Sequence, residues 1–249
     1  MITNQARAAL AEYLMPAGWE GVERLERENH AVYAGALAAY EQTWAALASG
    51  RVPRELAPRK EEGNDTVESA LADKAVCVAI SGKMGTGKTS LLRKVGLPIA
   101  SIGDGIKEET AAVLAVRGFE WLTVDHVRLH KDVFRLFLQE FAEAKRIVLG
   151  KDWYVRRMVE RTSNWRAVGC DDVRMRGEAD VIARSGFTLV RLEAPLDVRL
   201  SRLRSLYPSI TEAHLNYVSE TDLDNYPFEH VFDATLPLSE LAQALVATL

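Results

Sequence analysis

Residues 75–92 read AVCVAISGKMGTGKTSLL, and this stretch decides the fold. Its first six residues are uncharged and rich in β-branched side chains, which predicts a strand buried on both faces of a parallel sheet. Residues 82–89 match the pattern G-x-x-x-x-G-K-[ST] in full, and the apolar pair Leu91-Leu92 after it indicates a helix. The stretch therefore predicts a strand, a glycine-rich turn and a helix in direct succession.

The residue types of this turn suit a phosphate chain. Glycines let the backbone curl so that its N–H groups point at phosphate oxygens, and the following helix adds its positive N-terminal end. Lys88 is expected to reach the outer phosphates and Thr89 to offer its hydroxyl to Mg²⁺, which makes ATP and Mg²⁺ the expected cofactors. The expected nucleotide-binding residues are Gly82, Lys83, Met84, Gly85, Thr86, Gly87, Lys88, Thr89 and Ser90.

Strands and helices alternate in the rest of the chain. Further strands are predicted over 120–124, 167–170 and 188–192, and helices over 108–117, 131–147, 152–162 and 176–185. Alternation of this kind is typical of βαβ units, so we expect a three-layer α/β fold with a parallel sheet.

The first fifty residues have a different pattern. They are predicted to be helical, with large apolar side chains spaced 4-3-4-3 along one stripe: Tyr33, Leu37, Tyr40, Trp44 and Leu47. The stripe needs cover, either from the rest of the chain or from a partner subunit in a homodimer. Residues 50–73 carry two prolines, two glycines and a dense charge run, as exposed connectors do. We predict a helical segment at 1–50, a linker at 51–73 and the α/β domain at 74–249.

Composition sets the broad class. With 249 residues, 48% hydrophobic and 27% charged, the chain can bury a sizeable core, which excludes disordered and fibrous classes. We expect a cytoplasmic protein without a membrane span, because no stretch approaches roughly 18 uncharged apolar residues and the N-terminus lacks a basic region before an apolar run. Cys77 and Cys170 are too few for a disulfide framework or a zinc cluster.

The net charge of −4 is unevenly distributed. Residues 145–176 hold nine basic and four acidic side chains, which indicates either an anionic ligand or a solvated helix face. Two further groups of polar residues can be interpreted in the same two ways, as a site for an anion or as a solvated surface. On the 131–147 helix, Asp132, Arg135, Gln139 and Arg146 fall within about 60° of one another. In LDVRLSRLRSLYP, Arg199, Arg202 and Arg204 form either a clamp over the phosphates or a basic solvated helix.

The residues after the 167–170 strand bear on whether the protein transfers the γ-phosphoryl group or hydrolyses ATP. A motor ATPase normally follows a later apolar strand with Asp-Glu, whose glutamate polarises a water molecule. Here the strand ends in Asp171-Asp172, so the usual water-activating residue is missing.

Together these segments resemble the phage-type deoxynucleoside monophosphate kinases, members of the P-loop kinase group. Residues 101–108 (SIGDGIKE) are similar to the family's F-A-D-P-L-K-E, and 135–139 with Arg146 to its R-x-L-L-Q helix and following arginine. Residues 171–180 (DDVRMRGEAD) are similar to its D-D-V-R-F-x-N-E, and Ser219-Glu220 with Leu223-Asp224 to its S-E-x-x-L-D. The resemblance covers residues 76–235.

The resemblance implies a three-layer P-loop kinase fold and a second anion site. Its implied acceptor-site residues are Asp104, Lys107, Arg135, Gln139, Arg146, Arg174 and Glu178. It makes Asp172 with Thr89 the magnesium pair, with Asp171 beside them, and it implies host cytoplasm if the protein is phage-encoded. Lys88, Mg²⁺ and the three arginines at 199, 202 and 204 would stabilise in-line transfer of the γ-phosphoryl group.

Three functions follow as hypotheses. The first is a kinase acting on a small-molecule nucleotide, a deoxynucleoside monophosphate. The second is a kinase for the hydroxyl of a modified (hydroxymethyl) pyrimidine in DNA, which needs a base; Asp125 is its candidate, while a helix N-cap is the alternative for Asp125 and His126. The third is a non-catalytic ATP-binding scaffold. The expected catalytic residues are Lys88, Asp125, Asp172, Arg199, Arg202 and Arg204.

Overall fold

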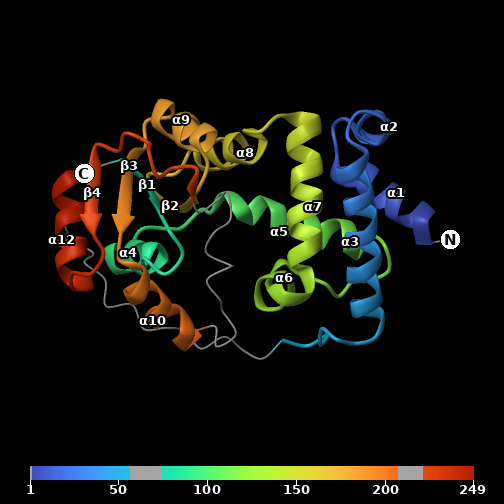
Figure 1. Ribbon diagram of the computed structural model, residues 1–249, viewed down its shortest axis with the longest axis horizontal. Helices are drawn as coiled ribbons and strands as arrows, with labels where there is room; N and C mark the ends of the chain where they lie inside the picture. Colours follow the sequence, from blue (N-terminus) through green and yellow to red (C-terminus); the bar gives the residue numbers. More distant parts are fainter. Residues whose placement is uncertain (1, 57–74, 207–220) are drawn as a thin grey trace. The chain divides into compact units, whose positions relative to one another are not determined.

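A computed structural model describes residues 2–56, 75–206 and 221–249 (Figure 1). Its contacts divide the chain into two compact units, each of which is discontinuous in sequence. A helical unit combines residues 1–60 with 103–154, and a sheet unit combines 61–102 with 155–249. Each unit has its own core.

The helical unit is built from six helices of the described residues. These are α1 (Ile2–Tyr13), α2 (Gly18–Glu28), α3 (His30–Ala48), α5 (Ile102–Ala115), α6 (Val124–Leu129) and α7 (Lys131–Leu149). Their core is aromatic: Phe137 and Phe141 of α7 stack with ring centroids 3.9 Å apart, and Tyr13 of α1 meets Phe141 edge-on at 5.1 Å. Burying large rings in this way is a main source of stability for a helical unit.

The predicted stripe on α3 is covered inside this unit. Tyr33, Tyr40 and Leu47 are buried, and Leu37 and Trp44 pack against the same core, which includes the inner face of α7. The prediction that the first fifty residues are helical and pack on the rest of the chain is therefore confirmed. A homodimer remains an untested prediction.

The predicted strand over 120–124 is wrong. These residues form turns that lead into α6, and Thr123 is the residue that caps this helix. His126 reciprocates, since its Nδ1 lies 3.1 Å from the Thr123 backbone nitrogen and 2.8 Å from the Thr123 hydroxyl. This capping box favours a helix start over a strand.

The sheet unit contains four strands, all parallel, in the order β2-β1-β3-β4. They are β1 (Val76–Gly82), β2 (Ala167–Val173), β3 (Thr188–Glu193) and β4 (His230–Asp233). The helices α4 (Lys88–Val95), α8 (Trp153–Thr162), α9 (Arg176–Arg184), α10 (Leu196–Leu206) and α12 (Leu238–Thr248) accompany them. The α/β class with a parallel sheet is thus as predicted, while β4 was not predicted.

Helices cover both faces of this sheet. Side chains alternate along a strand, so Val78 and Ile80 of β1 point to one face, where they join Leu91 and Leu92 of α4 and Leu245 of α12 in a single core cluster. Helix α9 packs on β3 from the opposite side, as Figure 1 shows. The result is a three-layer arrangement.

A short segment after α4 extends the sheet at its β2 edge. Gly169 donates from its backbone to Pro98, and Ala100 donates back to Gly169, with N···O distances of 2.8 and 2.9 Å. A side chain at 169 would lie 2.7 Å from Leu92, so glycine allows α4 to pack closely here. The segment delivers Ser101 and Ile102 to the carboxyl end of β2.

The linear division at 1–50, 51–73 and 74–249 does not anticipate that residues 103–154 cluster with the first helices. Most of the predicted linker lies outside the described residues. Within the described ranges, no helix is both long enough and apolar enough to cross a bilayer.

Candidate phosphate-binding site

The residues 82–89 connect β1 directly to α4, as predicted. Gly87 caps α4 with φ +90°, in the left-handed region where glycine is favoured, and a Cβ there would meet nothing within 4 Å. Gly85 is constrained differently, because a Cβ there would lie 2.8 Å from the Arg199 carbonyl oxygen. The loop is therefore packed against α10 on one side at Gly85 and open at Gly87, where the helix N-terminus begins.

Lys88 is the first residue of α4, and its ammonium folds back onto the loop. Nζ donates to the carbonyl oxygens of Gly82 at 2.6 Å and Lys83 at 3.2 Å, and the residue is only 8% exposed. The hydroxyl of Thr86 donates to the same Lys83 carbonyl at 2.9 Å. The cation is thus held inside the curl of the loop, where a phosphate oxygen would compete with carbonyls for it.

Thr89 and the carboxyl end of β2 form the next part of the site. The Thr89 hydroxyl donates to Asp171 Oδ2 at 2.5 Å, and the Ser101 hydroxyl donates to Asp171 Oδ1 at 2.5 Å. Asp172 faces elsewhere: its Oδ1 accepts from the backbone N–H of Ile102 at 2.7 Å, at the start of α5. The structure therefore pairs Thr89 with Asp171, whereas the resemblance implied Asp172.

This pair has the chemistry that Mg²⁺ prefers. A threonine hydroxyl and a carboxylate supply hard oxygen ligands, and a nucleotide-bound Mg²⁺ completes its octahedron with phosphates and water. Within the described part of the chain, no group of three or more His, Cys, Asp or Glu side chains could hold a metal without such help. Thr89 and Asp171 therefore fit a metal that arrives with a nucleotide.

The three arginines of α10 have different surroundings. Arg199, 7% exposed, donates to the carbonyls of Ala194 at 3.2 Å and Met84 at 3.3 Å, and Arg202 donates to Gly85 at 3.4 Å and Ala234 at 2.8 Å. Arg204 is exposed. Arg199 and Arg202 thus hold the outer side of the loop through its backbone carbonyls.

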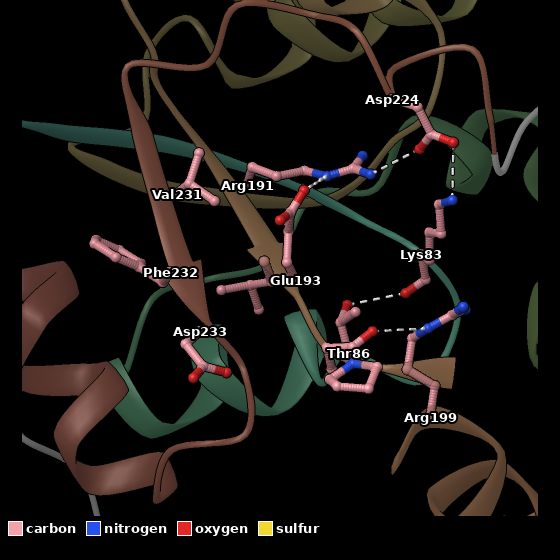
Figure 2. Close-up of a pocket in the computed structure, with 12 residues that line it drawn as sticks. Lys83, Thr86, Arg191, Glu193, Arg199, Asp224, Val231, Phe232 and Asp233 are labelled. Atoms are coloured by element: carbon pink, nitrogen blue, oxygen red, sulfur yellow. Dashed lines mark hydrogen bonds and ion pairs between the residues drawn. The ribbon is translucent and has the colours of Figure 1, made fainter. Parts of the chain in front are cut away.

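A cavity of 740 Å³ opens beside the loop at the carboxyl ends of β3 and β4 (Figure 2). Its lining combines loop residues, cations, carboxylates and apolar groups: Lys83, Thr86, Arg191, Leu192, Glu193, Ala194, Pro195, Arg199, Asp224, Val231, Phe232 and Asp233. In parallel α/β sheets, ligands bind at the carboxyl ends of strands, and this volume is in the range of small-molecule sites.

Five of the acceptor candidates belong to the helical unit. Asp104 and Lys107 form an ion pair at 3.0 Å on α5, and Arg128 of α6 binds the same carboxylate oxygen at 3.1 Å. Burial by itself would raise the pKa of Asp104, but Lys107 and Arg128 outweigh it and hold the pKa below its ordinary value. Asp104 is therefore ionised at neutral pH.

The remaining three lie on α7. Arg135 and Gln139 are exposed. Arg146 lies 3.7 Å from Glu143, and its guanidinium is 5.7 Å from the centre of the Tyr154 ring. The Tyr154 hydroxyl is fixed in turn, because it pairs with the Tyr13 hydroxyl at 2.7 Å and donates to Glu109 at 3.1 Å.

The two acceptor candidates of the sheet unit form one local structure. Glu178, 7% exposed, accepts from the backbone N–H groups of Arg174 at 2.9 Å and Met175 at 3.0 Å through Oε2. Glu178 therefore caps the start of α9, a structural role that its identification as an acceptor ligand did not include.

Asp125 is the second residue of α6 rather than the end of a strand. Its Oδ1 accepts from Arg128 Nη1 at 3.2 Å, and its side chain is 43% exposed. The cap itself is Thr123, with His126 as its partner, so the N-cap alternative is confirmed for His126 and wrong for Asp125.

Arg191, near the loop, was not singled out from the sequence, and its partner Asp224 was named only within the S-E-x-x-L-D resemblance, without a role in the site. Arg191 is a charge inside the otherwise apolar run TLVRLEA, and it is 5% exposed on β3. A buried arginine needs a partner, so the charge in this run was the available signal.

The sheet and the loop define the class: an α/β protein with a parallel sheet and a G-x-x-x-x-G-K-[ST] loop between its first strand and the following helix. No family model matches the chain. Over 132 residues it is 31% identical to a UPF0200 protein from Aeropyrum pernix, a match covering 51% of this chain and 62% of that relative, so the chain spans less than two thirds of its length. A gluconokinase structure from Sinorhizobium meliloti aligns with 70% of this chain and 90% of its own, with a TM-score of 0.42 and 15% identity. Neither match bears on a phage source or DNA modification.

Proposed function

We propose that the protein is an ATP-dependent phosphotransferase whose acceptor is a deoxynucleoside monophosphate. One observation carries the proposal: the first two residues of α4 are both engaged at the glycine-rich loop. Lys88 is buried against the carbonyl of Gly82, and Thr89 donates to Asp171 at the end of β2. Lysine for the phosphates and oxygen ligands for Mg²⁺ are the parts that phosphoryl transfer requires.

On this proposal, the phosphate chain of ATP replaces the carbonyl oxygens that now hold Lys88. The ammonium then neutralises negative charge on the outer phosphates, which is where charge shifts during transfer. Thr89 and Asp171 would hold Mg²⁺, whose positive charge would neutralise part of the phosphate charge. Arg199 and Arg202 stabilise the loop from its outer side. They donate to the carbonyls of Met84 and Gly85, which keeps these carbonyls from turning toward the phosphates.

The acceptor part of the proposal rests on charge. A monophosphate oxygen is ionised at neutral pH and needs no base, whereas an alcohol acceptor does. Asp125 would be that base, but its Oδ1 already accepts a hydrogen bond from Arg128 Nη1 at 3.2 Å. This arrangement favours the monophosphate over the hydroxyl of a modified pyrimidine.

The test is incubation with γ-labelled ATP and Mg²⁺ in the presence of deoxynucleoside monophosphates, ordinary DNA or hydroxymethylated DNA. We expect label in a diphosphate product, and Asp125→Asn to retain turnover within about threefold, since proton removal contributes about 10²–10⁴-fold only where a base is required. Label confined to DNA, lost in Asp125→Asn, would establish the hydroxyl kinase instead. ATP binding without label in any acceptor would establish a scaffold.

A further inference from the structure

A single carboxylate contacts two cations beside the loop. Asp224 Oδ2 accepts from Lys83 Nζ at 2.8 Å, and Oδ1 accepts from Arg191 Nη2 at 3.1 Å, so each oxygen serves a different cation. Figure 2 shows Asp224 between the two side chains. Lys83 belongs to the loop and Arg191 to β3, so one carboxylate connects the loop to the sheet.

These contacts involve the residues on both sides of Gly82 in the chain. Arg191 also donates through Nη1 to the Ser81 hydroxyl at 3.2 Å, and Ser81 and Lys83 are the two chain neighbours of Gly82. Asp224 therefore contacts one neighbour directly and the other through Arg191. The Gly82 carbonyl lies between them, and it is the closest acceptor of the Lys88 ammonium.

The pairing with Asp224 satisfies a charge that would otherwise be costly to bury. The Arg191 side chain is 6% exposed, and its other carboxylate, Glu193, lies 3.6 Å away with a largely exposed side chain. A partner that is 62% exposed at that distance compensates a buried charge poorly, whereas the Asp224 side chain is 35% exposed and its contact is shorter, at 3.1 Å. Asp224 is thus the stronger of these two partners.

Asp224 is itself held in place from the far side. Its neighbour Asp222 accepts from the backbone N–H of Arg176 at 2.7 Å, at the start of α9, and the Tyr226 hydroxyl donates to Asp180 at 3.1 Å. Residues 222–226 are therefore anchored on α9, and Asp224 projects from this anchored segment toward the loop.

We propose that Asp224 is a positioning residue for the phosphate chain. Acting through Lys83 and Arg191, it holds Ser81, Gly82 and Lys83 in the conformation in which the loop accepts phosphates and Lys88 is correctly placed. The inference rests on the proposed binding of ATP in this loop. It predicts that loss of the Asp224 charge weakens polyphosphate binding, with or without a nucleoside attached.

The test compares Asp224→Asn with Glu229→Gln, which removes an exposed carboxylate further along the chain that takes no part in the contacts described above. Binding of ATP and of inorganic tripolyphosphate, each with Mg²⁺, is measured by calorimetry, together with the melting temperature. We expect Asp224→Asn to weaken both ligands about tenfold, the scale of couplings between contacting charges, and Glu229→Gln to change either by less than about twofold.

A double-mutant cycle tests the route of the effect. Lys83→Met removes the loop partner of Asp224, whose side chain is 30% exposed, so the variant should fold. We expect it to weaken the binding of both ligands. If Asp224 acts through Lys83, the double variant Lys83→Met/Asp224→Asn is less impaired than the product of the single effects. Asp224→Glu, which keeps the charge, is expected to restore most of the affinity.

The outcomes separate this inference from the proposed function. If the wild type binds and Asp224→Asn and Glu229→Gln have equal affinities, or if the effects in the cycle are fully multiplicative, the positioning role alone is overturned. Tighter tripolyphosphate binding by Asp224→Asn would also overturn it, because Asp224 would then compete with phosphate for Lys83. A wild-type protein that binds neither ligand would contradict both proposals.

Discussion

At the scale of single residues, the site depends on which way neighbouring side chains point. Asp171 and Asp172 are adjacent on β2, where the pairing with β1 shifts register between Cys170 and Val173. Asp171 meets Thr89 and Ser101, while Asp172 meets the backbone of Ile102. Equal charges at adjacent positions thus have separate tasks, one at the loop and one at the start of α5.

Asparagine at each of these two positions should therefore have different effects. We expect Asp171→Asn to lower turnover about a hundredfold or more, the effect of removing one group that stabilises the transferring charge, and to raise the Mg²⁺ concentration required. Asp172→Asn should retain the Mg²⁺ requirement. Steady-state rates over a Mg²⁺ titration measure both, and equal Mg²⁺ dependence of the two variants would contradict the assignment of Asp171.

Asp104 gives a residue-scale prediction for pH. Because Lys107 and Arg128 lower its pKa in the folded protein, its ion pairs contribute stability above the ordinary value of 3.8, and that contribution is lost as pH falls through the lowered value. We expect Asp104→Asn to lower the free energy of unfolding by about 1–2 kcal/mol at pH 7 and to approach wild type in acid.

Urea unfolding at pH 7 and in acid measures this difference. Asp132→Asn is the control, since Asp132 pairs with Arg51 at an exposed site in the same unit. A destabilisation of Asp104→Asn that persists unchanged in acid would show that packing, and not charge, is responsible.

At the scale of helices and strands, close packing at the β2 edge positions the loop helix. Gly169 leaves room for Leu92, and the same glycine exchanges backbone hydrogen bonds with the segment that carries Ser101. The contact therefore aligns two parts of the site at once: α4 with its Lys88 and Thr89, and the hydroxyl that fixes Asp171.

Alanine at this position should be destabilising although it adds one methyl group. We expect Gly169→Ala to cost about 1–3 kcal/mol through overpacking against Leu92. Gly177 of α9 is the matched control, because a Cβ there meets nothing within 4 Å and alanine suits a helix better, so Gly177→Ala should stabilise by about 0.5–1 kcal/mol. Chemical denaturation of both variants measures these changes in the free energy of unfolding. Equal changes in the two variants would refute the packing argument.

The sequence allowed some elements to be predicted and not others, for physical reasons. Buried strands such as β1, β2 and β3 are runs of apolar residues, which local periodicity reveals. Residues 120–124 have similar residue types, but Thr123 and His126 form a capping box and the segment turns into α6. The edge strand β4 has only four residues with alternating partial exposure, too short a pattern to stand out.

At the scale of the whole molecule, the chain leaves the sheet unit after Ile102 and returns after Tyr154. A linear pattern of helices cannot show that residues 103–154 share a core with the first three helices, because that core depends on contacts between distant segments such as α3 and α7. The glycine-rich loop, by contrast, is local in sequence, so its position between β1 and α4 could be predicted, while its binding of phosphates stays a prediction. Among the acceptor candidates, which are divided between both units, Arg135, Gln139 and Arg146 could be recognised as one polar helix edge, whereas their common role with the others came only from the resemblance.

The most direct test of the central claim is calorimetric titration of ATP with Mg²⁺ into wild-type protein, Lys88→Ala and Lys94→Ala. Lys94 lies on the same helix, one residue before its last, and serves as the matched control for charge. We predict that Lys88→Ala weakens ATP binding about a hundredfold or more, since it removes a buried cation from the phosphates, while Lys94→Ala binds like wild type. Undiminished ATP binding by Lys88→Ala would contradict the account.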